Sequence, residues 1–218
     1  MSRPSTTDLA VLTTSQLGGF TAPQLGVLSG SQLGAFSTTA LADLSTTQVG
    51  GLSAAQVGGM STTAINALTT TVIANLSTLQ IGGMSAAQLS NLSNFAALSS
   101  GQVTGISNAQ FGALTTTALT ALSTAQIGGV TVGQIGQLST TQFNALTTNV
   151  IAQFDTAQIG GITTTQIASL PVGDFQVLSA AQLSELSLTQ TGYISTTDLA
   201  VLTTVQLGGF TSAQLGAM

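Results

Sequence analysis

An eight-residue unit repeats along almost all of the 218-residue chain. It is clearest at residues 44–51, which read Leu-Ser-Thr-Thr-Gln-Val-Gly-Gly, and the next unit follows at once from Leu52. We label its positions a to h. Positions a and f are apolar, b is Ser or Thr, e is usually Gln, and c, d, g and h are usually small. A short fixed period of this kind predicts stacked units that share one continuous core.

The spacing of the apolar positions favours helices over strands. Five residues separate a from f, and three separate f from the next a. Both numbers are odd, so a flat strand would turn the two apolar positions to opposite faces. Residues three apart instead share one face of a helix. Because Thr, Val and Ile favour strands by propensity, a β-solenoid is the alternative fold.

The polar positions predict a helix start in every unit. Ser or Thr occupies b in 25 of 27 units, and Gln occupies e in 18 of the 26 units that keep this position. Ser or Thr followed three residues later by Gln is the capping box, in which each side chain accepts a hydrogen bond from the other residue's backbone N–H. Positions a and f then form the hydrophobic staple around the helix start. We expect Gly pairs at g and h to supply the permissive backbone of each helix end.

Helices of about one and a half turns are unstable alone. We therefore predict an all-α solenoid with one short capped helix in each octad and the a and f side chains packed inside. Units without Gln at e that precede a Gly-Gly unit fall on even places in the array. Phe at f falls only on odd places, at Phe95, Phe111, Phe143 and Phe175. This parity predicts an even number of octads per coil, most simply two, with a four-sided coil as the alternative.

No change of composition marks a linker, so we expect residues 1–218 to form a single octapeptide-repeat domain. Two stretches are expected to be irregular. A unit is shortened within residues 93–98, and Pro171 replaces the hydroxyl residue at b within residues 170–175.

The composition excludes most kinds of chemistry. Only 3% of residues are charged, His, Cys, Trp and Lys are absent, and Arg3 is the only basic residue. The chain lacks thiolate and imidazole metal ligands, the usual nucleophile and base pairs of enzymes, and the basic surface that nucleic-acid binding requires. No run approaches 18 apolar residues, so no membrane span is expected. We expect no enzymatic activity, no catalytic, cofactor-binding or metal-binding residues, and no cofactor.

Six acidic residues remain as candidates for chemistry, namely Asp8, Asp43, Asp155, Asp174, Glu185 and Asp198. They are scattered, whereas a paired-carboxylate site needs two of them close together. Three of them occupy e and Asp155 occupies b, where a carboxylate suits the start of a helix. We interpret these residues as caps or solvated surface.

Two units carry a resemblance to a known kind of repeat: residues 44–51 (Leu-Ser-Thr-Thr-Gln-Val-Gly-Gly) and residues 162–170 (Ile-Thr-Thr-Thr-Gln-Ile-Ala-Ser-Leu). They resemble the Leu/Thr/Gln-rich short repeats of very large bacterial surface or secreted proteins, often described as adhesin-like. The resemblance covers essentially the whole chain and carries no functional residue with it. It implies an extracellular or cell-surface setting. The first seven residues lack an apolar signal-peptide core, so we expect any export signal to lie outside this chain.

A structural role is the first functional hypothesis: a rigid stalk, a spacer or a segment of a self-assembling filament. Residues 195–218 match residues 5–28 at 19 of 24 positions, and neither end shows a polar capping unit, which predicts end-to-end self-association. The alternative is an ice-binding or glycan-binding solenoid that uses its Thr/Gln-rich wall. Positions c and d mix Thr with other residues, so a strict Thr ladder is often interrupted.

Overall fold

The computed structural model describes residues 4–218, and in this range it contains 26 short α-helices, one 3-10 helix and no strand. The all-α prediction is confirmed, and the β-solenoid alternative is not supported. Contacts group the chain into two compact units, which we describe separately. Unit 1 extends to Ser107 and unit 2 begins at Asn108. A single domain over residues 1–218 stays a prediction.

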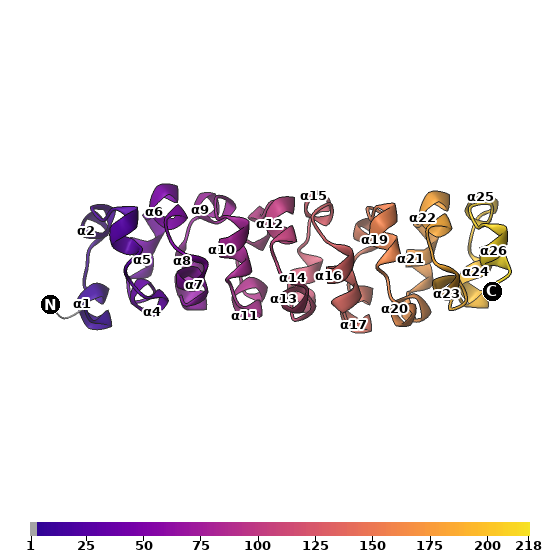
Figure 1. The fold of residues 1–218 in the computed structure, drawn as a ribbon, viewed down its shortest axis with the longest axis horizontal. Coiled ribbons are helices and arrows are strands. Elements are labelled where there is room, and N and C mark those ends of the chain that lie inside the picture. The colour runs from indigo at the N-terminus through magenta and orange to yellow at the C-terminus, as the bar shows by residue number, and fades with distance from the viewer. Residues whose placement is uncertain (1–3) are drawn as a thin grey trace. The chain divides into compact units, whose positions relative to one another are not determined.

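In unit 1, each octad forms one short helix (Figure 1). The helices are α1 (Thr6–Ala10), α2 (Thr14–Gly18), α3 (Ala22–Leu25), α4 (Gly30–Leu33), α5 (Thr38–Ala42), α6 (Thr46–Gly50), α7 (Ala54–Gly58), α8 (Thr62–Ala67), α9 (Thr70–Ala74), α10 (Thr78–Gly82), α11 (Ala86–Ser90), the 3-10 helix η1 (Phe95–Ala97) and α12 (Ser100–Thr104).

Unit 2 repeats the same design. Its helices are α13 (Asn108–Gly112), α14 (Thr116–Thr120), α15 (Thr124–Ile127), α16 (Val132–Gln137), α17 (Thr140–Asn144), α18 (Thr148–Ile151), α19 (Thr156–Gly160), α20 (Thr164–Ser169), α21 (Val172–Gln176), α22 (Ala180–Ser184), α23 (Leu188–Thr191), α24 (Thr196–Ala200), α25 (Thr204–Leu207) and α26 (Ser212–Leu215).

The helices begin as the capping box predicts. At α6, Ser45 is extended, with φ −75° and ψ 159°. Its hydroxyl accepts from the Gln48 backbone N–H at 3.2 Å, while Gln48 Oε1 accepts from the Ser45 backbone N–H at 2.9 Å. Asp155, one of the two departures at b, caps α19 in the same way, with Oδ1 accepting from the Gln158 N–H at 2.7 Å. Side chains one turn apart therefore satisfy backbone donors that a short helix leaves unpaired.

The glycines at helix ends act differently from the expectation. No described residue, glycine included, has a positive φ, so the helix ends need no left-handed residue. Several glycines instead let neighbouring backbones approach closely. A Cβ on Gly30 would lie 2.5 Å from the carbonyl carbon of Gly59, and one on Gly209 would lie 2.5 Å from the Ala180 oxygen. At these positions the absence of a Cβ atom lets the backbones of successive coils come into contact.

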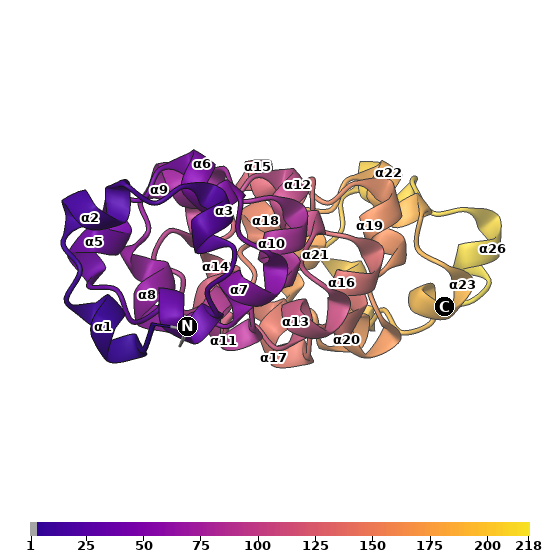
Figure 2. The ribbon, with the colours of Figure 1, turned by 60° about the vertical axis from the view of Figure 1, so that its left-hand side comes forward.

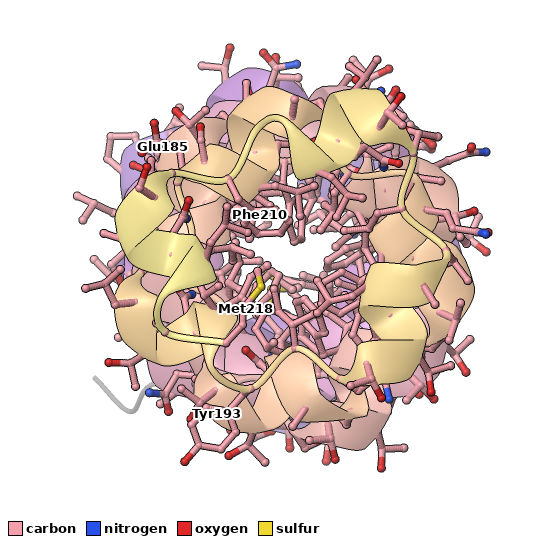
Figure 3. The ribbon with its side chains drawn as sticks, turned by 90° about the vertical axis from the view of Figure 1, so that its right-hand side faces the viewer. Glu185, Tyr193, Phe210 and Met218 are labelled. Carbon is pink, nitrogen blue, oxygen red and sulfur yellow. The ribbon has the colours of Figure 1, made fainter. Side chains whose placement is uncertain are left out.

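Positions a and f fill the interior of both units. Among the f residues, Val57, Ile81, Ile135 and Phe175 are completely buried. At the C-terminal end of unit 2, Phe210 and Met218 point inward while Glu185 and Tyr193 lie on the outside (Figure 3). Each octad therefore contributes two side chains to a shared apolar core, which compensates for the low intrinsic stability of a helix of four to six residues.

One coil, meaning one turn of the solenoid path, holds about three and a half octads. Helices pack against partners three octads away, as α2 does with α5 and α19 with α22 (Figures 1 and 2). Hydrogen bonds from Gln48 reach 28 residues back to Phe20 and 31 residues back to Leu17. The prediction of an even number of octads per coil is therefore wrong. The start of a helix packs over the end of an earlier helix, so one coil holds a half-integral number of octads. The parity of the variant octads in the sequence does not indicate this number.

The two irregular stretches differ in kind. In the shortened unit, residues 95–97 form the 3-10 helix η1, whose N-cap residue Asn94 makes no side-chain cap bond. At residues 170–175 the helix α21 does form, but its N-cap residue Pro171 supplies no side-chain acceptor. The irregularity there lies in the hydrogen bonds rather than in the path of the helix.

Candidate functional site: the glutamine ladder

The glutamine at position e has a second role besides capping. In α10, Gln80 Oε1 accepts from the Ser77 N–H at 2.8 Å, which completes the capping box. The other end of the same amide, Nε2, donates to the carbonyl oxygens of Val49 and Leu52 in the previous coil, at 2.8 Å each. The side chain is only 3% exposed. One buried amide thus joins a helix start to the coil beneath it.

This arrangement recurs through both units, and we call it the glutamine ladder. The Nε2 atom of each member donates to the carbonyl of an a residue, almost always 28 residues earlier, at 2.6–2.8 Å. Its described members are Gln48, Gln56, Gln80, Gln88, Gln102, Gln142, Gln158, Gln166, Gln182, Gln190, Gln206 and Gln214. Because buried carbonyls need donors, the ladder satisfies helix-end oxygens that no backbone N–H reaches.

The sequence carries a signal for the ladder that the capping box alone does not explain. Glu completes a capping box as well as Gln does, yet no octad has Glu at e. A carboxylate offers no donor to the carbonyls of the previous coil. The Nε2 atom thus gives Gln a contact that Glu cannot make, and the spacing of the capping box does not indicate this contact.

The ladder adapts to the shortened unit. There Gln102 donates to Leu76 and Ile73, 26 and 29 residues back, instead of 28 and 31. Its bond to Leu76 is 2.7 Å long, as elsewhere in the ladder. The loss of two residues is thus absorbed without loss of the bond.

Pro171 interrupts the hydrogen bonding of unit 2. The comparable position in unit 1 is Ser93, whose N–H and hydroxyl both donate to Asn66 Oδ1, at 3.0 and 3.3 Å. In unit 2, Asn144 Nδ2 donates to Ser169 O at 2.7 Å, as Asn66 Nδ2 does to Asn91 O. Among the described side chains, however, Asn144 Oδ1 is buried without a partner. Proline offers neither an N–H nor a hydroxyl, which explains the orphaned oxygen.

Asp174 lies in the same octad as Pro171, at position e. It is buried, and burial raises the pKa of its carboxyl above the usual range. By contrast, Asp8 occupies e in the first octad and accepts from the backbone N–H and the hydroxyl of Ser5 at 3.0 and 2.7 Å. Those two bonds lower the pKa of Asp8. The contrast shows that a hydroxyl residue at b stabilises an ionised carboxylate at e by hydrogen bonds, which Pro171 cannot supply to Asp174.

The other acidic residues lie at helix ends. Asp155 caps α19, and Asp198 accepts from the Ser195 N–H at 3.1 Å. Asp43 and Glu185 are the C-cap residues of α5 and α22. Within residues 4–218, no three carboxylates come together as a metal-ion site. Nor does any described helix have the length and apolar character needed to cross a membrane.

A shallow surface groove lies in unit 1, where the connection after α2 meets the connection after α5. Its lining includes Phe20, Thr21, Pro23, Asp43, Ser45 and Thr47. Hydroxyls and one carboxylate surround a half-buried aromatic ring. Asp43 is the only ionisable side chain among these lining residues.

Comparisons with known proteins agree with the repeat pattern. A search of curated proteins finds no match to the chain. Residues 121–126 read Ala-Leu-Ser-Thr-Ala-Gln. Three segments, residues 30–62, 103–140 and 140–172, match the family model of the ALTTAQ repeat, which supports an array built from this type of repeat.

Proposed function

We propose that the chain is a non-catalytic structural segment of a bacterial surface or secreted protein, acting as a rigid stalk or spacer that can also assemble into filaments. The observation that carries this proposal is the glutamine ladder. In each unit the glutamines at position e, the most regular polar side chains of the sequence, hydrogen-bond one coil to the next. A segment built in this way resists deformation between coils.

Composition and resemblance support the rest of the proposal. The chain has no His, Cys or Lys, and the two serine hydroxyls that donate to a carboxylate, Ser5 to Asp8 and Ser195 to Asp198, do so within capping boxes, which supports a non-catalytic role. The extracellular setting rests on the resemblance of the octads to short repeats of bacterial surface proteins.

Location and inertness can be tested together. An antibody raised against the purified chain is expected to label intact cells of the source bacterium, or to detect the chain in the culture medium. Labelling that appears only after permeabilisation would contradict the surface role. The purified chain is also expected to leave esterase, phosphatase, glycosidase and peptidase substrates unchanged, and turnover above the buffer rate would argue for an enzyme.

A second candidate function is binding of a glycan, or of ice, by the outer wall. The groove of unit 1 favours it, because the Thr47 side chain lines it together with the Phe20 ring and Asp43. A glycan array should then show a ligand that Asp43→Ala weakens, and thermal hysteresis would instead identify ice binding. If neither assay detects binding, only the structural role remains.

A further inference from the structure

Two buried oxygens of unit 2 lack hydrogen-bond donors. Among the described side chains, Asn144 Oδ1 is buried without a partner. The Asp174 side chain is only 4% exposed, and its carboxyl accepts no hydrogen bond from the described part of the chain, so that burial alone raises its pKa. Buried polar atoms are rarely left without a partner. Both oxygens lie beside Pro171, as their counterparts elsewhere in the chain show.

The direction of the Asn144 side chain follows from its counterpart in unit 1. Asn occupies position g in two octads only, at Asn66 and Asn144. Both side chains donate through Nδ2 to a carbonyl oxygen 25 residues later, at 2.7 Å. Oδ1 of Asn66 then accepts from the N–H and the hydroxyl of Ser93, 27 residues later, at 3.0 and 3.3 Å. Pro171 is the residue 27 positions after Asn144, so Asn144 Oδ1 lies beside it.

A carboxyl at position e reaches the same place from within its own octad. Asp198 accepts from the N–H and the hydroxyl of Ser195 at 3.1 and 2.5 Å, and Asp8 accepts from Ser5 in the same way. An oxygen at e and an Asn oxygen of the preceding coil thus take one position, within hydrogen-bond distance of the N and Oγ atoms of residue b. At Ser93 they do not compete, because the shortened octad lacks position e.

The two oxygens meet at Pro171. Within residues 4–218, this is the only b residue that both kinds of oxygen approach, Asn144 Oδ1 from the preceding coil and the Asp174 carboxyl from its own helix. Proline offers a donor to neither of them. A carboxylate and an amide oxygen are both acceptors, whereas a protonated carboxyl carries an O–H donor. One proton on Asp174 therefore gives both oxygens a partner.

We propose that the Asp174 carboxyl binds a proton in the folded chain and donates it to Asn144 Oδ1. The bond joins α21 to the end of α17, one coil earlier, and replaces the contact that Pro171 cannot make. It is present while the carboxyl is neutral and is lost as the pH rises through the folded pKa of Asp174. The inference goes beyond the proposed structural role, because it gives unit 2 a contact between coils that responds to acidity.

The charged groups around Asp174 offer the carboxylate no other partner. Helix α21 packs against α18 and α24. Neither α18 nor the neighbouring α17, α20 and α22 contains a titratable residue, and α24 contains only Asp198, whose negative charge opposes a second one nearby. No basic side chain lies within residues 4–218. The surroundings therefore favour the neutral form of Asp174.

The proton can be followed by NMR in the unaltered chain, labelled with ¹³C at the Asp carboxyls and ¹⁵N at the Asn side chains. The Asp174 carboxyl signal is assigned by its loss in Asp174→Asn. We expect this carboxyl to stay protonated at pH values where Asp8 is already ionised, because bonds from Ser5 lower the pKa of Asp8. The side-chain amide signal of Asn144 should shift with the same midpoint. That of Asn66 is the internal control and should not follow it.

Asn144→Leu separates the proposed bond from burial alone. Without its acceptor, Asp174 should bind its proton about tenfold more weakly, the value of one ordinary hydrogen bond. If burial alone held the proton, the apolar leucine would raise the midpoint or leave it unchanged. Asn66→Leu, the matched control in unit 1, should leave the Asp174 midpoint where it is.

Three results would each overturn the proposal. They are an Asp174 carboxyl that ionises together with Asp8, an Asn144 amide signal that does not follow the titration of Asp174, and a midpoint that Asn144→Leu raises or leaves unchanged. Circular dichroism checks the fold of each variant. The first two results come from the unaltered chain and do not depend on whether Asn144→Leu folds.

Discussion

At the scale of single residues, the glutamine at position e joins local and long-range structure. Its Oε1 atom fixes the start of its own helix, and its Nε2 atom fixes the coil before it, as the bonds of Gln80 show. Local preference and tertiary contact therefore favour the same conformation. Agreement of this kind between levels is what makes a sequence specify one fold.

Exchanging the amide for a carboxylate at one ladder position tests this double role. Gln80→Glu keeps the capping acceptor but deprives the Leu52 carbonyl of its donor and buries a charge, whereas the Val49 carbonyl still accepts from the Leu52 backbone N–H. We expect a loss of several kcal/mol in unfolding free energy, since each buried group left unpaired costs about 1–3 kcal/mol. The exposed counterpart, Gln16→Glu, should change the unfolding free energy by less than about 0.5 kcal/mol. Urea denaturation of both variants makes the comparison, and equal losses would contradict a role for Nε2.

Asp174 gives the fold a dependence on pH with a defined sign. Because burial raises its pKa, the folded chain binds this proton more tightly than the unfolded chain. The stabilisation is complete below the unfolded pKa and is lost as the pH rises through the folded pKa. We expect Asp174→Asn to gain stability relative to the unaltered chain as the pH rises from about 3 to about 7.

Asp8→Asn is the matched control, with the opposite sign. The bonds from Ser5 lower the pKa of Asp8, so this variant should lose stability at neutral pH and lose less in acid. Melting temperatures of both variants against pH test the pair. Parallel pH profiles for the two would refute the assignment. Pro171→Ser should also lower the raised pKa of Asp174. Serine would supply an N–H and a hydroxyl to the carboxylate, as Ser195 does to Asp198.

The residue pattern predicts the helix caps but not the hydrogen bonds between coils. Capping at Ser45 and Gln48 follows from a spacing of three residues, and the structure confirms it. The bond from Gln48 to Phe20 spans 28 residues, and no local rule fixes that distance. The orphaned oxygen of Asn144 depends on Pro171, which lies far along the sequence, so neither residue alone indicates it.

At the scale of elements, each helix is a single short segment whose ends touch other coils. The glycines near helix ends therefore fall into two classes with the same backbone conformation. A Cβ on Gly83 would overlap the backbone of Ala54, whereas one on Gly50 would meet nothing within 4 Å. The sequence showed Gly pairs but could not separate these classes, because the difference arises from a neighbour about 29 residues away.

Alanine substitution distinguishes the two classes. Gly83→Ala should destabilise unit 1, because two backbones must move apart, by about 1–3 kcal/mol as in other overpacked sites. Gly50→Ala should stabilise it by about 0.4–1 kcal/mol, because alanine loses less conformational entropy on folding. Thermal unfolding followed by circular dichroism measures both. Stabilisation by both substitutions would show that close approach is not why Gly83 is glycine.

At the scale of whole units, the repeat and its apolar core follow from the sequence, and the size of a coil does not. Parity of the variant octads indicated an even number, yet the ladder spans 28 residues. Coil size depends on how a helix start fits over an earlier helix end, which is a property of packing.

Deletions of different lengths test the coil at this scale. Removing residues 53–60, one whole octad, leaves each later ladder glutamine at its present spacing from an a residue, so helicity per residue and cooperative unfolding should be kept. Removing residues 53–56 moves Gln80, whose bond to Leu52 spans the deletion, out of register with the a residues, while Gln56 is lost. We expect this shorter deletion to lower the melting temperature more than the longer one. The reverse order would show that the octad is not the unit of register.

The half-octad remainder of each coil also limits what the outer wall can present to a crystalline surface. Successive coils are offset by half an octad. A threonine at c or d therefore has a g or h residue beside it in the next coil. Identical rows recur only in every second coil, seven octads apart. A lattice of hydroxyls on one side of a unit would therefore have twice the spacing of the coils, which any periodic ligand would have to match.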